Sequence, residues 1–210
     1  MKPKSKVKRE RIYNAVNLTE VHSIATTRAI NYLSNEIGKY SRITPQIVSD
    51  EEKDDKWNFT FLSVGGHTNF KSTDVIESNE FLKFDVDSNT IISVKTGHSV
   101  LHNELDSKYK DFGVIIKTNP ESNLKRTWIC CAGLSEWGTS GAAWWLANNW
   151  KQIRKKAKKG PFAVVTCTRK GSDESTVLVK FCTRAEDVEC DDQELSGNDQ
   201  LSTTSEPQDD

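Results

Sequence analysis

The segment from Trp128 to Trp150, WICCAGLSEWGTSGAAWWLANNW, has residue types and a spacing that suit an anionic ligand. An apolar strand leads into a loop bounded by Gly133 and Gly138, and a helix is predicted to begin just after Gly138. Free backbone N–H groups and the positive end of the helix dipole would then lie at the carboxyl end of a strand, a place that suits a phosphate. We therefore predict that Gly133, Gly138, Thr139 and Ser140 bind a ligand, with the two hydroxyl residues capping the helix.

The same loop resembles a P-loop in the spacing of its glycines, but Thr139 occupies the position of the P-loop lysine. Without that lysine a nucleoside triphosphate would lack its main charge partner, and we exclude a P-loop NTPase. Two interpretations remain open. The loop holds a phosphate, or Gly138, Gly141 and Ala142 pack the helix against the sheet.

A second glycine turn, Gly65-Gly66, follows a predicted strand at 57–64 and precedes His67 and Asn69. Paired glycines allow positive φ angles and a close approach of a ligand to the backbone. The alternative is an ordinary strand-to-helix turn without a ligand. If the two strands are parallel neighbours, both turns lie at the sheet edge where α/β proteins collect ligands, so we predict ligand contacts for Gly65, Gly66, His67 and Asn69.

No catalytic constellation completes this site, and whether the chain is an enzyme stays open. The ligand class is a nucleotide, an NAD-like molecule or another phosphorylated small molecule, and the domain is a sensor or a hydrolase or transferase of nucleosides or dinucleotides. If it is an enzyme, the acid/base candidates are His67, Asp74, Glu77 and Glu136. His98 and His102 are four residues apart but lack a third ligand, so no metal site is predicted.

Hydrophobic periodicity and turn residues predict the elements that position these residues. Strands are predicted at 11–16, 43–48, 57–64, 81–86, 90–94, 112–118, 127–132, 162–168 and 176–181, and helices at 21–37, 73–77 and 139–156. The segments at 112–118 and 127–132 read as an antiparallel hairpin. The order of elements predicts an α/β fold, a three-layer Rossmann-like sandwich with a mixed, partly antiparallel sheet.

The apolar residues of this 210-residue chain are concentrated between residues 12 and 182. This distribution predicts a single α/β domain at 11–183, flanked by a basic disordered N-terminus at 1–10 and an acidic disordered tail at 184–210. Five cysteines without a zinc-like spacing indicate a reducing compartment. With no secretory signal and no apolar run of about 20 residues, we predict a cytoplasmic protein that does not associate with a membrane.

The charge is strongly asymmetric. Ten acidic residues and no basic ones follow Arg184, which leaves 29 basic and 20 acidic residues before it, a net charge of about +9. Basic clusters lie at 2–11 and 151–159. Two interpretations remain open. In the first, the charged ends only keep the chain soluble. In the second, the basic body attracts polyanions such as nucleic acid without sequence preference, and the acidic tail competes for the same surface.

The long helix is predicted to have an inward-facing apolar stripe that includes Ala143, Leu146 and Ile153. Trp144 and Trp145 are predicted to lie on the outer flanks of this stripe. Either neighbouring elements cover the two tryptophans, or they form an interface for a protein partner or a second copy.

Three motifs together resemble a loosely defined group of uncharacterised prokaryotic Rossmann-like domains. They are a strand ending in GG-x-x-N (Val64 to Asn69), a strand with an Asn-Pro turn (Gly113 to Pro120), and AGLxxWGTSGAA (Ala132 to Ala143). The similarity covers roughly residues 11–155. In that group a proline often follows the second glycine, where this chain has His67. The resemblance implies a Rossmann-like fold and nucleotide-type ligands, and it supplies no catalytic residues.

Overall fold

The computed structural model describes residues 23–40, 46–47, 60–66, 69–85, 87–101, 109–119 and 126–188. The predicted strands at 11–16 and 43–48 lie wholly or almost wholly outside these residues. The elements in chain order are α1 (Ile24–Tyr40), β1 (Phe61–Val64), α2 (Phe70–Ser78), β2 (Leu82–Asp85), β3 (Thr90–Ser93), β4 (Lys110–Thr118), β5 (Trp128–Gly133), α3 (Glu136–Ala157), β6 (Phe162–Arg169), β7 (Ser172–Cys182) and the 3₁₀ helix η1 (Ala185–Val188).

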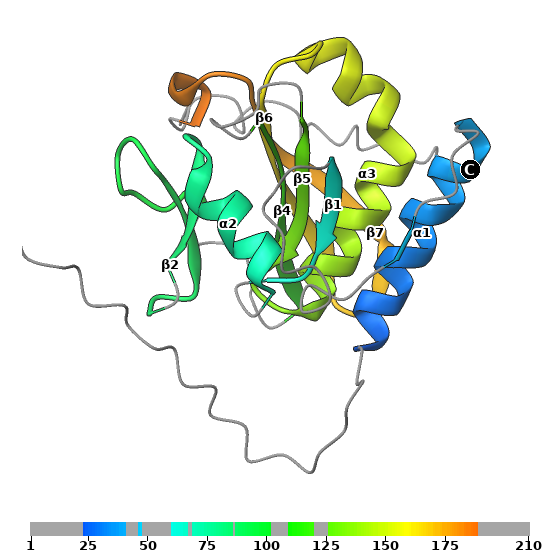
Figure 1. The fold of residues 1–210 in the computed structure, drawn as a ribbon. Helices are drawn as coiled ribbons and strands as arrows, with labels where there is room; N and C mark the ends of the chain where they lie inside the picture. Colours follow the sequence, from blue (N-terminus) through cyan, green and yellow to red (C-terminus); the bar gives the residue numbers. More distant parts are fainter. Residues whose placement is uncertain are drawn as a thin grey trace, which may run out of the picture.

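Five strands form one sheet in the order β1-β5-β4-β6-β7, and β2 with β3 forms a separate hairpin (Figure 1). β1 runs parallel to β5, whereas the other three pairs in the sheet are antiparallel. The prediction of a mixed, partly antiparallel sheet and of an antiparallel β4/β5 pair is confirmed. A regular βαβ alternation is absent from the described sheet, because only one of its four pairs is parallel.

The sheet is covered on both faces. On one face, α2 and the β2–β3 hairpin pack on the sheet through a core that includes Val75, Phe81 and Ile116. On the other face, α3 and α1 pack through a core that includes Leu33, Ile115 and Leu146. β4 lies at the centre of the sheet and is buried on both faces, which explains its nearly continuous apolar sequence.

The edge strand β7 is less regular than its neighbours. Its pairing with β6 shifts register between Val165 and Thr166 and again between Cys167 and Arg169. Val177 and Leu178 are exposed along this strand. The chain then continues through η1, so the described fold extends beyond residue 183, the predicted end of the domain.

The long helix begins earlier than predicted. Its first residue is Glu136 and its N-cap is Ser135, so Gly138 lies in the first turn rather than before it. A Cβ atom at Gly138 would collide with the carbonyl oxygen of Phe112 in β4, and one at Gly141 would collide with the Thr168 hydroxyl in β6. These glycines therefore bring the helix into direct contact with the sheet, as the packing interpretation predicts.

Neighbouring elements cover the tryptophans of α3. Trp145 is only 6 % exposed and belongs to the same core as Ala29 and Leu33 of α1. The interpretation that a neighbouring element covers Trp145 is confirmed, and the element is α1, which the sequence did not identify. Trp144 is half-buried, and the indole N–H of Trp150 donates to Glu36 of α1 (2.9 Å). In the described residues, no helix combines the length and apolarity needed to cross a membrane.

The tight contact between α3 and the sheet predicts opposite effects for two glycine substitutions. Gly138→Ala forces the helix away from β4, and we expect it to lower the free energy of unfolding by about 1–3 kcal/mol or more. Gly38→Ala, in α1 with open space around it, removes backbone freedom and should be neutral or stabilising by up to about 1 kcal/mol. Urea unfolding of both variants measures the difference, and equal effects would contradict the packing role.

Candidate functional site

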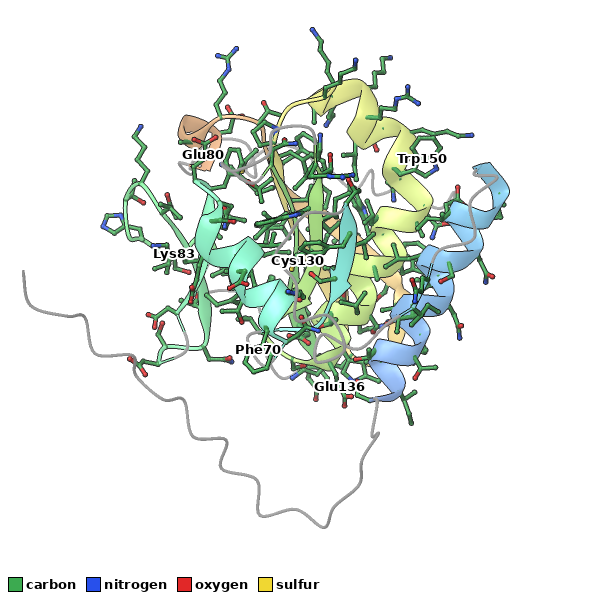
Figure 2. The ribbon with its side chains drawn as sticks, in the orientation of Figure 1. Phe70, Glu80, Lys83, Cys130, Glu136 and Trp150 are labelled. Carbon is green, nitrogen blue, oxygen red and sulfur yellow. The ribbon has the colours of Figure 1, made fainter. Side chains whose placement is uncertain are left out.

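The two glycine turns meet at one edge of the sheet. Because β1 and β5 are parallel, with Val64 opposite Cys131, both strands end on the same side. The N–H of Gly65 donates to the Cys131 carbonyl (3.0 Å), and a Cβ at Gly66 would touch the Gly133 carbonyl at 3.4 Å. The co-location on which the predicted site depends is therefore confirmed. Figure 2 shows Phe70 and Glu136, the first residues of the two following helices, at this same end.

A carboxylate of the chain itself occupies the start of α3. Asp111 of β4 is 5 % exposed, and its Oδ2 accepts hydrogen bonds from the Gly138 N–H (2.5 Å) and the Ser135 hydroxyl. Its Oδ1 accepts from the Phe112 N–H (2.9 Å). Asp111 thus caps α3 from a neighbouring strand and places a negative charge at the positive end of the helix dipole.

Thr139 and Ser140 do not cap the helix, contrary to expectation, since both lie inside it. The Thr139 hydroxyl donates to the Ser135 carbonyl (3.2 Å) within the first turn. The Ser140 hydroxyl donates to Asp173 Oδ1 (2.6 Å) on the face that packs toward α1 and β7. The prediction missed that Ser135 followed by Glu136 is itself a common way to begin a helix.

A cleft opens beside this helix start. Its volume is about 640 Å³, and it lies between the β2–β3 hairpin and the residues where β4 begins and β5 ends. Hydroxyl, amide and charged groups line much of it, together with an apolar part formed by Ile92, Leu101, Phe112 and Leu134. The charged residues in its wall are Asp85, Lys110, Asp111 and Lys170.

Two lysines supply the positive charge of the cleft wall, and its two carboxylates accept hydrogen bonds from the chain. Asp111 caps α3. Asp85 accepts hydrogen bonds from the Ser88 hydroxyl (2.5 Å) and the Ser88 and Asp87 N–H groups, and these bonds hold the pKa of Asp85 below its usual value. Lys110 and Lys170 come from the start of β4 and the β6–β7 turn. Neither was singled out from the sequence, because isolated lysines in turns carry no motif.

Of the residues predicted to bind the ligand, those that the structure describes are not part of the cleft wall. Asn69 caps α2, since its side-chain oxygen accepts from the Ser72 N–H (2.9 Å). Gly65 has a φ of 131°, which favours glycine and supports the turn. Gly133, at the end of β5, directly precedes Leu134 and Ser135, which do line the cleft.

The acid/base candidates that the structure describes are not part of the cleft wall either. Asp74 and Glu77 lie on α2, outside its buried positions at Ser72, Val75 and Ile76. Glu136 is the exposed first residue of α3, where its charge favours the helix dipole. His67 lies outside the described residues, so its predicted roles stay predictions.

A buried polar cluster joins α1, α3 and β7 on the other face of the sheet. Asp173 is 3 % exposed and accepts from Ser140, from Arg28 Nη2 (3.1 Å) and from the Tyr32 hydroxyl (3.0 Å). The Arg28 guanidinium also lies over the Trp137 ring, 4.3 Å from its centroid. Because Asp173 is engaged by three donors of the chain itself, the cluster fixes α1 on α3 rather than binding a ligand.

The described cysteines are unsuited to nucleophilic chemistry. Cys130, Cys131, Cys167 and Cys182 are free and buried, and burial raises the pKa of each thiol, to about 12 for Cys130 and Cys182. A nucleophilic cysteine needs the opposite shift. The described residues also contain no group of three or more His, Cys, Asp or Glu side chains placed to hold a metal ion.

The capping role of Asp111 predicts a large loss of stability on its removal. In Asp111→Ala, the Gly138 N–H loses its buried acceptor, and we expect the free energy of unfolding to fall by about 2–3 kcal/mol. Asp87→Ala, at an exposed turn position, is the matched control and should change it by less than about 0.5 kcal/mol. Denaturant titration compares the two, and a similar small loss in both would refute the cap.

The Asp173 cluster predicts a high-pH transition. Burial, the hydrogen bond to Asp173 and its negative charge raise the pKa of Tyr32 from 10.0 to about 12. The folded state disfavours the Tyr32 phenolate, so the neutral side chain contributes to the free energy of unfolding. This contribution is complete below pH 10 and is lost as the pH rises toward 12. Phenolate absorbance should therefore show one of the four tyrosines titrating near pH 12, and Tyr32→Phe should remove that step. An unchanged titration curve in Tyr32→Phe would contradict the assignment.

Comparison with protein families, with curated proteins and with solved structures finds no match for this chain. The resemblance to prokaryotic Rossmann-like domains therefore stays a prediction.

Proposed function

We propose that this chain binds a phosphorylated small molecule, such as a nucleotide, in the cleft beside the start of α3. The observation that carries the proposal is the cleft itself, whose volume of about 640 Å³ lies within the range of about 300–1,000 Å³ typical of ligand sites. It combines an apolar part with a small set of polar groups, as such sites do. It also lies at the carboxyl end of β5, where α/β proteins bind ligands.

The phosphate is held by Lys110 and Lys170 rather than by the backbone of α3. Asp111 already accepts the Gly138 N–H, and its charge would repel a second anion at that point. The apolar residues Phe112 and Leu134 suit the base or another flat group of the ligand, and the hydroxyl and amide groups of Thr90, Ser99 and Asn89 suit a sugar.

We propose that the chain binds this ligand as a sensor does, and we propose no reaction on it. In the described wall of the cleft there is neither a histidine nor a cysteine to act as base or nucleophile. The Ser135 hydroxyl donates to Asp111, but that carboxylate already accepts three hydrogen bonds that hold the start of α3 and the backbone of β4. Hydrolysis or transfer would need a base or nucleophile from outside this described wall, such as His67.

We also propose a Rossmann-like, three-layer arrangement and a cytoplasmic location. The first is supported by two strand–turn–helix units, β1 with α2 and β5 with α3, on opposite faces of the sheet. The second is supported by the four cysteines that the structure describes, which are all free, because thiols stay reduced in such a compartment.

The binding proposal is tested by thermal unfolding with a panel of nucleotides, NAD and inorganic pyrophosphate. A ligand present at about 100 times its Kd adds about 2.7 kcal/mol to the free energy of unfolding. In Lys110→Ala/Lys170→Ala we expect affinity to fall by at least about 10-fold, because each charge-assisted contact contributes about 1.5–3 kcal/mol. Lys155→Ala, at the other end of α3, is the matched control and should bind normally.

Two results would refute the proposal: no member of the panel raises the unfolding temperature, or the double lysine variant binds as tightly as the parent. Substitutions at Gly138 cannot serve as the test. Any side chain there collides with β4, so a loss of binding would report only a loss of the fold.

A further inference from the structure

The carboxyl-terminal end of α3 carries a dense positive surface. It consists of five residues, Arg154, Lys155, Lys156, Lys158 and Lys159, which we call the basic end of α3. All five are exposed. The ion pairs in the described part of the chain are Arg28 with Asp173 and Lys39 with Glu36, and neither involves the basic end.

The helix dipole explains only part of this accumulation. Cations are favourable in the last turn of a helix, by about 0.3–1 kcal/mol each at exposed positions. The carbonyl groups just beyond the helix already accept hydrogen bonds from another residue. The Lys117 ammonium of β4 donates to the carbonyls of Lys159 (2.7 Å) and Gly160 (3.0 Å). The five cations of the basic end lie close together and repel one another, so the surface favours an anionic partner.

The chain leaves the fold beside this surface. The last residue of β7, Cys182, pairs with Ala163 at the start of β6, just after the end of α3. The preceding residue, Phe181, stacks on Phe162, and the Lys156 ammonium lies 5.2 Å from the centroid of the Phe181 ring. Figure 1 shows η1 and the end of α3 at the same end of the sheet.

The direction in which the chain continues after β7 is also fixed. Asp187 Oδ2 accepts from the N–H groups of Thr183 (2.8 Å) and Arg184 (2.9 Å), which closes η1 directly after β7. The sequence beyond η1 is acidic. The residues between 189 and 210 include no base and eight acids: Glu189, Asp191, Asp192, Glu194, Asp199, Glu206, Asp209 and Asp210.

We propose that the acidic segment 189–194 binds the basic end of α3 of the same molecule and blocks it toward other polyanions. Asp191 and Glu194 lie three and six residues beyond Val188, which gives them a reach of about 10–20 Å in an extended chain. The contact is intramolecular, so a short connection gives it a high effective concentration. It consists of exposed charges and is therefore weakened by salt. This inference is independent of the cleft, which lies at the other end of α3.

The first test is zero-length crosslinking of the full-length chain with a carbodiimide, which joins carboxylates directly to amines. Mass spectrometry of the monomeric product should show links from Asp191, Asp192 or Glu194 to Lys155, Lys156, Lys158 or Lys159. These links should disappear at about 1 M NaCl, where the Debye length is about 3 Å. Links spread over all lysines, or found only in crosslinked dimers, would overturn the proposal.

The second test measures whether the acidic segment blocks the surface. Asp191→Asn/Asp192→Asn should require a higher salt concentration for elution from heparin, a sulfated polyanion. The matched control Asp87→Asn/Glu174→Gln changes the net charge equally at exposed positions, Asp87 in the β2–β3 turn and Glu174 near the β6–β7 turn. A smaller shift in the control supports the blocking contact. Equal shifts in the two variants would show that only net charge matters and would refute it.

Discussion

The fold depends on the direct contact between the first turn of α3 and the backbone of β4. Gly138 lies against the carbonyl of Phe112, and Gly141 lies against Thr168 of β6, with no room for a side chain at either position. This contact buries the centre of the sheet under the helix. It also brings Asp111, the residue before Phe112, within reach of the helix start. Packing and capping are thus consequences of the same pair of short-range contacts.

An internal carboxylate at a helix start changes what the surrounding loop can do. A free helix N-terminus attracts anions, whereas this one is neutralised from within. The spacing of Gly133 and Gly138 resembles a phosphate loop because both kinds of loop bring a helix close to a strand. Here the proximity serves packing, and positive charge for a ligand comes instead from Lys110 and Lys170 in the neighbouring cleft.

The sequence predicted the described strands and helices well, because their apolar runs are long and their turns carry glycine, proline or asparagine. It also predicted that the Gly65 and Gly133 turns share an edge. It did not predict the start of α3, since a sequence does not show that Asp111 caps Gly138 across 27 positions. It missed the cleft for the same reason, because β2–β3, Lys110 and Lys170 meet only in three dimensions. The burial of Trp145 depends on α1, which is distant in the sequence.

The irregular edge strand β7 affects the tendency of the folded chain to aggregate at high concentration. An open strand edge is a template on which another sheet can grow, and long flat edges lead to fibrils. β7 exposes Val177 and Leu178, which would favour such growth. Its two register shifts twist the strand, and the exposed charge of Glu174 lies on the same edge. Within the described part of the chain, the irregular pairing therefore makes this edge a poorer template for edge-to-edge growth.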